Sequence, residues 1–139
     1  MNSALILGLS GLALTPEERA FFAELQPWGF ILFKRNCESK EQVLRLTDEL
    51  RALSGRSNVP ILIDQEGGRV ARLRPPVWRL PPPAWTFAEI YERDVETAEE
   101  AAALNSRLIA AELREIGVNV SCSPCIDLQH DEGHGIIGD

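Results

Sequence analysis

The sequence has few basic residues and no long apolar run. Its 14 lysine and arginine residues are outnumbered by 21 acidic residues, which gives a formal net charge of −7. A nucleic acid or an anionic membrane surface would need a basic face, so we expect neither as a partner. A membrane-spanning helix needs about 18 consecutive apolar residues, and no such stretch occurs.

Cysteine is also scarce. Cys37, Cys122 and Cys125 are too few for a disulfide scaffold, and three cysteines cannot all pair within one chain. The apolar stretch 4–14 lacks the basic residues that precede a secretory signal core, since Arg19 is the first one. We therefore expect a cytoplasmic location. The length of 139 residues predicts a single domain with a real core.

Strand-like and helix-like segments alternate along the chain. Apolar runs predict strands at residues 4–9, 29–33, 59–63 and 118–127. The third run has no polar alternation, which is typical of a strand buried on both faces of a parallel sheet. Residues 73–85 are rich in proline, so we expect a long loop there and a functional surface.

Local signals place the helices between these strands. Thr15-Pro16-Glu17-Glu18 combines an N-cap, a proline at the first helical position and a capping-box glutamate. A second helix is predicted from Ser39, with Gln42 at the capping-box position and an apolar stripe of Val43, Leu46, Leu50 and Leu53. A third is predicted over about 94–116, with Gly117 after its end.

This order predicts an α/β fold with parallel strands and right-handed crossovers. It fits an open doubly wound sheet or part of a (β/α)8 barrel. The absence of a G-x-G-x-x-G motif after the first strand disfavours a dinucleotide-binding sheet. A whole barrel needs about 250 residues, so four strands predict an incomplete (β/α)8 TIM barrel of about half that size.

The densest group of polar residues follows the third predicted strand. Asp64 and Glu66 come at its carboxyl end, where parallel α/β folds bind ligands, and Arg69 and Arg72 follow a Gly67-Gly68 turn. Arginine offers a rigid set of donors to hydroxyls or carboxylates. The same residues could instead form a structural ion pair beside a glycine turn, and residue types alone leave both interpretations open.

Several motifs resemble the N-terminal domain of glycoside hydrolase family 3, and most closely its bacterial β-N-acetylhexosaminidases. They are Gly29-Phe30-Ile31-Leu32-Phe33, Arg35-Asn36, Asp64-Gln65-Glu66-Gly67-Gly68-Arg69-Val70, Pro81-Pro82-Pro83-Ala84, Gly117-Val118-Asn119-Val120, Ser123-Pro124-Cys125-Ile126-Asp127 and Ile136-Ile137-Gly138-Asp139. The resemblance covers nearly the whole chain in order. It implies that residues 1–139 are the N-terminal half of the family's catalytic barrel.

The resemblance also implies a function. It predicts a retaining hydrolase that releases terminal β-linked N-acetylglucosamine, notably from muropeptides in peptidoglycan recycling, without a cofactor. By motif, Asp64 and Arg72 match residues that bind the hydroxyls of the sugar in the −1 subsite. The substrate-clamping residues, the acid/base histidine and the nucleophilic aspartate of the family match no position up to Asp139. We therefore assign no catalytic residue and expect this fragment alone to be inactive.

Three alternatives remain. Asp64 and Asp127 could act as a carboxylate pair, although the family uses these positions for binding or structure. Cys122, Cys125, His130 and His134 have zinc-like spacing, but residues three apart on a strand face opposite sides, so we expect no metal and no redox pair. The open barrel edges could drive self-association or partner binding.

Three aromatic residues, Trp78, Trp85 and Phe87, could stack on a sugar or simply pack a core.

Overall fold

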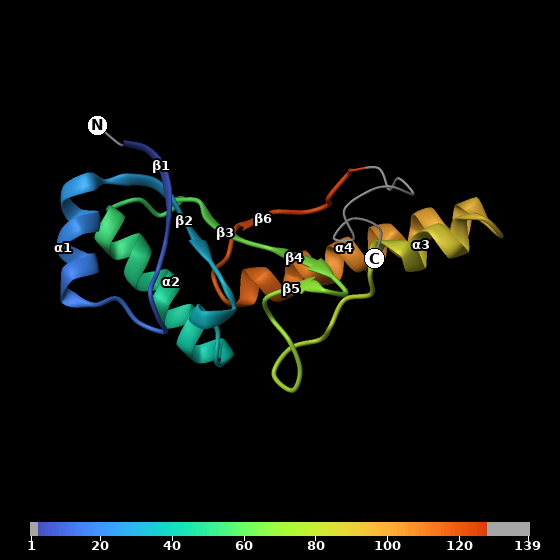
Figure 1. Ribbon diagram of the computed structural model, residues 1–139, viewed down its shortest axis with the longest axis horizontal. Helices are drawn as coiled ribbons and strands as arrows, with labels where there is room; N and C mark the ends of the chain where they lie inside the picture. Colours follow the sequence, from blue (N-terminus) through green and yellow to red (C-terminus); the bar gives the residue numbers. More distant parts are fainter. Residues whose placement is uncertain (1–2, 128–139) are drawn as a thin grey trace, which may run out of the picture.

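The computed structural model describes residues 3–127 as a four-stranded parallel sheet with helices packed against it (Figure 1). The strand order is β1-β2-β3-β6, and all three neighbouring pairs are parallel. These strands are β1 (Ser3–Gly8), β2 (Pro27–Leu32), β3 (Ile61–Ile63) and β6 (Val120–Ser121). The sheet is open in the described residues, with β1 and β6 at its edges, and the predicted α/β class is confirmed.

The helices follow the predicted alternation, with two helical elements that the sequence did not predict. They are α1 (Pro16–Leu25), α2 (Lys40–Ser54), α3 (Ala84–Tyr91) and α4 (Val95–Glu115), together with the short 3-10 helix η1 (Lys34–Asn36). Strands β4 (Gln65–Gly67) and β5 (Val70–Ala71) form a small antiparallel hairpin directly after β3. None of the helices in residues 3–127 has the length and apolar character needed to span a bilayer.

Side-chain caps fix the starts of α1 and α2. The capping box of α1 is confirmed, because the Glu18 N–H donates to Thr15 Oγ1 at 3.1 Å and Glu18 Oε2 accepts from the Thr15 N–H at 2.9 Å. Ser39 caps α2 as predicted. The capping box predicted for Gln42 is wrong, since its side-chain oxygen accepts from the Glu38 N–H and its amide donates to Leu12 O.

The last strand is much shorter than predicted. The apolar run 118–127 predicted one long strand, but β6 comprises only Val120–Ser121. Its partner β3 ends at Ile63, and Pro124 has no N–H with which to extend a ladder. Before β6, the Asn119 side chain accepts from the Ile61 N–H at 2.7 Å and donates to Val59 O at 3.0 Å. Together with the backbone bond from the Asn119 N–H to Ile61 O at 3.2 Å, these bonds join the two chain segments before β6.

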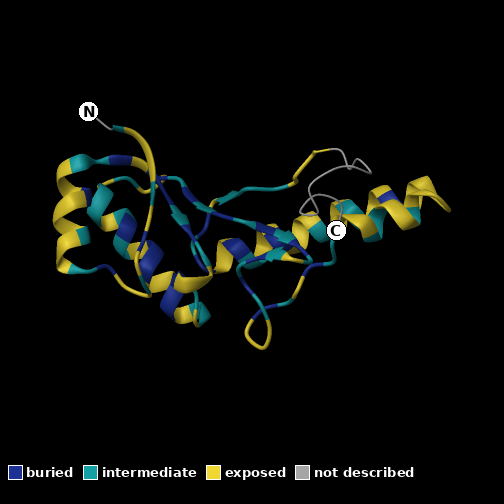
Figure 2. Ribbon diagram, viewed as in Figure 1, coloured by how far each residue is buried: buried dark blue, intermediate teal, exposed yellow. Residues whose placement is uncertain are grey.

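The proline-rich loop is also shorter than predicted. Helix α3 begins at Ala84, so the expected loop of residues 73–85 ends at Pro83. Proline is favoured at helix starts because its φ is already helical and its missing N–H needs no partner there. No residue of α3 is buried, and the helix packs along α4 (Figures 1 and 2).

The core lies on one face of the sheet only. Phe30, Leu32, Ile61 and Ile63 are fully buried there, against the predicted apolar stripe of α2 and the end of α4. The register aligns Gly8, Ile31, Leu62 and Val120 on the opposite face. Ile31, Leu62 and Val120 are only half-buried. In a closed (β/α)8 barrel this second face is the interior, where inward-pointing side chains form layers.

Candidate functional site

Three side chains lie in a row where the parallel strands end. The register pairs Leu32 with Ile63, and Ile63 with Ser121. The next residues along these strands are Phe33, Asp64 and Cys122, which we call the strand-end row. Because side chains alternate between the two faces of a sheet, this row lies on the face opposite the helix-covered core. It is therefore the uppermost layer of the barrel-interior face.

Asp64, the middle residue of the row, forms an ion pair with Arg72, which directly follows β5. Arg72 Nη2 donates to Asp64 Oδ2 at 2.6 Å, and the two side chains are 30% and 22% exposed. The sequence analysis singled out both residues, and the structure brings them together. An ion pair of this exposure can exchange part of its mutual contact for hydroxyl groups. The geometry therefore fits a ligand site as well as the structural ion pair that the sequence left open.

The hairpin β4–β5 holds Arg72 in place. Gln65 is 1% exposed, and its side-chain oxygen accepts from the N–H groups of Arg72 and Leu73 at 2.9 and 3.0 Å. Gly67 and Gly68 have φ values of +128° and +51°, which favour glycine. A Cβ on Gly67 would collide with Pro82 O, so this turn packs against the proline-rich loop.

Phe33 joins two arginines at the same edge. The guanidinium carbon of Arg35 lies 4.7 Å from the centre of the Phe33 ring, and that of Arg72 lies 6.0 Å from it. Both distances are within the range of cation–π attraction. Arg35 Nε also donates to Leu9 O at 2.7 Å, which ties the end of β1 to this edge. The sequence analysis quoted Phe33 and Arg35 only within the family motifs and did not assign either residue to the site; Phe33 directly follows β2, and Arg35 lies in η1.

Cys122 adds a thiol beside Asp64. Its N–H donates to Ile63 O at 2.9 Å and thereby continues the β3–β6 ladder by one residue. Burial raises the pKa of the Cys122 thiol, and the charge of Asp64, a hydrogen bond to Asp64 and the charge of Glu66 raise it further. A thiol with a raised pKa is neutral at pH 7 and donates its hydrogen.

The two cysteines of the Cys-x-x-Cys motif do not pair. Both are free, and Cys125 is exposed beyond β6 with its sulfur 3.7 Å from Asp127 Oδ2. The described residues contain no group of three ligands suited to a metal ion. His130, His134 and Asp139 lie outside the described residues.

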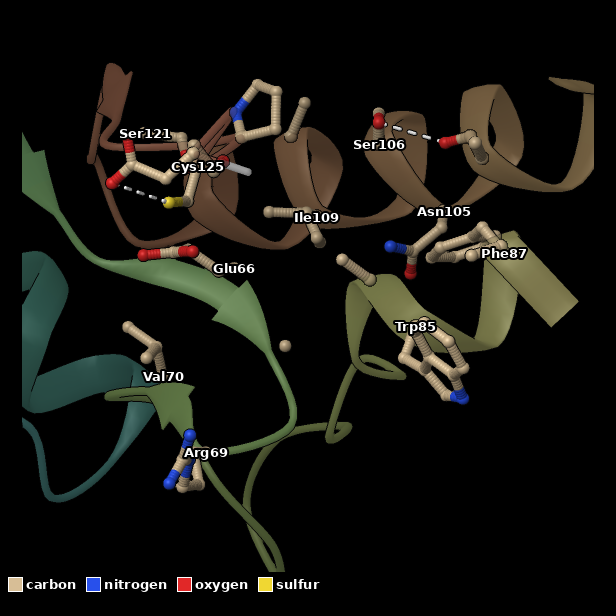
Figure 3. Close-up of a pocket in the computed structure, with 18 residues that line it drawn as sticks. Glu66, Arg69, Val70, Trp85, Phe87, Asn105, Ser106, Ile109, Ser121 and Cys125 are labelled. Carbon is tan, nitrogen blue, oxygen red and sulfur yellow. Dashed lines mark hydrogen bonds between the residues drawn. The ribbon is translucent and has the colours of Figure 1, made fainter. Parts of the chain in front are cut away.

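A cavity of about 690 Å³ lies beside the β4–β5 hairpin. It lies between the β4–β5 hairpin, α3, α4 and the segment after β6 (Figure 3). Glu66 and Asp127 line it, whereas Asp64 and Arg72 do not, so the cavity does not combine Asp64 with Asp127 as a catalytic pair. Figure 3 shows the Glu66 carboxylate pointing towards the segment that carries Cys125.

The three aromatic residues of the proline-rich region have different environments. Trp78 is 7% exposed and belongs to the core, which excludes it as a sugar-stacking residue. Trp85 is half exposed and lines the cavity together with Phe87 on α3. Stacking by these two residues stays a prediction.

The fold and the strand-end row define a parallel α/β barrel segment with the Asp64–Arg72 ion pair at the carboxyl ends of its strands. The sequence matches the Glycosyl hydrolase family 3 N terminal domain over residues 7–139, and the chain belongs to this family.

Similar proteins agree with this assignment. The chain is 42% identical over 134 residues to a beta-hexosaminidase of Thioalkalivibrio sulfidiphilus, covering 96% of this chain and 38% of that protein. It is 41% identical over 138 residues to a beta-hexosaminidase of Alkalilimnicola ehrlichii, covering 97% and 38%. The chain thus spans about two fifths of the length of the curated relatives it matches.

Solved structures show the same fold. NagZ from Neisseria gonorrhoeae in complex with N-trifluoroacetyl-D-glucosamine superposes with a TM-score of 0.84 at 32% identity, over 91% of this chain and 36% of that one. A glycoside hydrolase family 3 beta-N-acetylglucosaminidase from a Paenibacillus species superposes with a TM-score of 0.70 at 33% identity, over 86% and 22%. The parallel sheet of this chain therefore corresponds to a part of each of these larger structures.

Proposed function

We propose that the chain is the N-terminal half of the catalytic barrel of a β-N-acetylhexosaminidase. The enzyme would release terminal β-linked N-acetylglucosamine by a retaining mechanism, in cytoplasmic peptidoglycan recycling. The proposal is supported by the beta-hexosaminidase relatives and by the NagZ structure that holds an N-acylated glucosamine analogue. The Asp64–Arg72 pair at the strand ends is the single observation that carries the proposal to this chain.

Asp64 and Arg72 are the proposed substrate-binding residues. A carboxylate accepts hydrogen bonds from two neighbouring hydroxyl groups, and a guanidinium donates to their oxygens. A pyranose ring offers such adjacent hydroxyls. Because the carboxylate and the guanidinium already contact one another, their opposite charges neutralise each other before a sugar binds. Both groups are also oriented before the sugar arrives, which reduces the entropy lost on binding.

The same proposal assigns no catalytic group to residues 1–139. A retaining glycosidase with two carboxylates holds them about 5–5.5 Å apart, one as nucleophile and one as acid/base. Asp64 is engaged by Arg72 at 2.6 Å, which suits binding better than nucleophilic attack. We therefore expect the 139-residue chain to bind the sugar without hydrolysing its glycosides.

A chimera tests this function directly. Residues 1–139 replace the matching segment of the Thioalkalivibrio relative, and hydrolysis of a chromogenic β-N-acetylglucosaminide is measured beside the 139-residue chain alone. We expect activity in the chimera only, with Asp64→Ala and Arg72→Ala each lowering kcat/KM at least tenfold. Asp48→Ala is the control, since the Asp48 side chain is 67% exposed on α2. Activity of the short chain, or a fully active Asp64→Ala chimera, would overturn the proposal.

A non-catalytic, self-associating half-barrel is the second candidate. Edge strand β1 exposes Leu5 and Ile6, which are 46% and 43% exposed, and an unpaired edge of this kind can pair with another chain. Analytical ultracentrifugation separates the two candidates. A concentration-dependent dimer with no N-acetylglucosamine binding would favour the second.

A further inference from the structure

The position of Cys122 follows from the register of the sheet. Ile63 pairs with Ser121, and the Cys122 N–H donates to Ile63 O, so Cys122 stands beside Asp64 on the barrel-interior face. Ser121 and Ser123 line the cavity on the other side of the segment, and Cys122 does not. The thiol is thus directed to the side where Asp64 and Arg72 meet.

The chemistry of the thiol complements that of Asp64. The carboxylate has more acceptor positions than the bond from Arg72 Nη2 uses. Cys122 stands beside this carboxylate on the neighbouring strand, and the nearby charge of Asp64 helps to raise the pKa of its thiol. A neutral donor at this place orients the carboxylate without cancelling its charge. A sulfur atom is also larger and less polar than a hydroxyl oxygen, so it presents a partly apolar surface to a ring placed on Asp64.

We propose that Cys122 is a positioning residue of the sugar site, whose thiol orients Asp64 and forms one wall of that site. The inference rests on the proposed function, since it concerns the residue that binds the sugar hydroxyls. It predicts that a sugar bound to Asp64 covers Cys122. It also predicts that Cys122→Ala weakens sugar binding about three- to tenfold, the effect of one lost hydrogen bond, while Cys122→Ser restores most of the affinity.

The chain carries its own controls for a labelling experiment. Cys125 is exposed and lies outside the strand-end row, and Cys37 is half-buried against Phe33 O at 3.5 Å. Iodoacetamide alkylates a thiolate: the carbon–sulfur bond forms, iodide leaves, and the thiol proton has already passed to solvent. The labelling rate of each cysteine, measured by mass spectrometry as a function of pH, therefore reports the ionisation and exposure of that cysteine.

The first arm tests the contact with Asp64 in the absence of sugar. The charged groups around Cys122 are Asp64 and Glu66, with Arg72 paired to Asp64. Asp64→Asn removes the adjacent negative charge, so the midpoint of Cys122 labelling moves to lower pH. The Cys125 midpoint stays where it is. An unchanged Cys122 midpoint in Asp64→Asn would overturn the inference.

The second arm adds N-acetylglucosamine to the 139-residue chain, with binding followed independently by NMR chemical shifts. We expect the sugar to slow labelling of Cys122 but not of Cys125. Sugar binding without protection of Cys122 would overturn this inference and leave the proposed function standing. If no sugar binds while Asp64→Asn still moves the Cys122 midpoint, the proposed function fails in this chain and the pairing of thiol and carboxylate stands. The two failures are therefore distinguishable.

Discussion

The Asp64–Arg72 pair allows the stability and the binding role of one contact to be separated by mutation. The nitrogen and oxygen are 2.6 Å apart, but the side chains are 30% and 22% exposed, so solvent screens the attraction and rehydrates whichever partner remains. We expect Asp64→Ala to lower the free energy of unfolding by about 1 kcal/mol. Arg72→Ala should cost about 1–2 kcal/mol, because the guanidinium also lies over Phe33.

The expected effect on sugar binding is larger. A hydrogen bond to a charged group contributes about 1.5–3 kcal/mol, so either substitution weakens binding by a factor of about 10 to 150. Urea denaturation measures the stability of the wild type, both single variants and the double variant, which completes a double-mutant cycle. Titration with N-acetylglucosamine measures the affinity of the same four proteins.

One pattern of results would refute this reasoning. If both single variants lost the same large stability, about 3 kcal/mol or more, and kept their affinity for the sugar, the pair would be a structural ion pair. The exposure of both side chains argues against that outcome. Asp48→Ala on α2 controls for the general effect of removing an exposed carboxylate.

Four further substitutions or conditions test the framework of the site. Asn36→Ala removes three hydrogen bonds between a fully buried amide and the backbone, and we expect urea denaturation to show a loss of about 2–4 kcal/mol; a loss below about 1 kcal/mol contradicts this account. Gln65→Ala should lower the free energy of unfolding by a similar amount and also weaken sugar binding, since the Gln65 side chain fixes the backbone of Arg72 and Leu73. Unchanged sugar binding would show that Arg72 does not need this support. Gly117→Ala places a Cβ against Thr47 at a φ of +75°, so we expect a melting temperature lower by several degrees, and an unchanged value would refute the clash. Burial raises the pKa of the Cys37 thiol from 9.0 to about 12. The free energy of unfolding is therefore retained below pH 9 and falls as the pH rises towards 12, because over this range the thiol ionises only in the unfolded chain. Denaturation of Cys37→Ala over the same range should show a smaller fall.

The correctly predicted parts of the fold are those that depend on residues close together in the sequence. The Thr15 capping box and the glycine after α4 are local signals, and both are confirmed. Gln42 was assigned wrongly because its amide is drawn to Leu12 O, a contact made only in the folded chain. The strand predicted over 118–127 was too long because strand length depends on the partner, and β3 ends at Ile63.

The site was predictable to the same extent. The position of Asp64 at a strand end and the presence of a nearby arginine can be read from the sequence, whereas the contact between Asp64 and Arg72 is seen only in the structure. The position of Phe33 and Cys122 beside Asp64 was not predicted, because it depends on the register between β2, β3 and β6. Helix α3 is not predictable from the same signals, because the proline run before it favours one long loop.

The alternation of side chains along a strand explains why binding and stability separate here. From Ile63 onwards, successive residues have different tasks: Ile63 is buried in the core, Asp64 faces the barrel interior, Gln65 fixes the backbone of Arg72, and Glu66 lines the cavity. A change at Asp64 therefore alters the interior face while leaving the helix-covered core intact. A change at Gln65, which is buried, removes the hydrogen bond that holds the backbone of Arg72. A single segment of four residues thus links the core to the proposed sugar site. We expect its substitutions to divide into those that lose sugar binding and those that lose both sugar binding and stability.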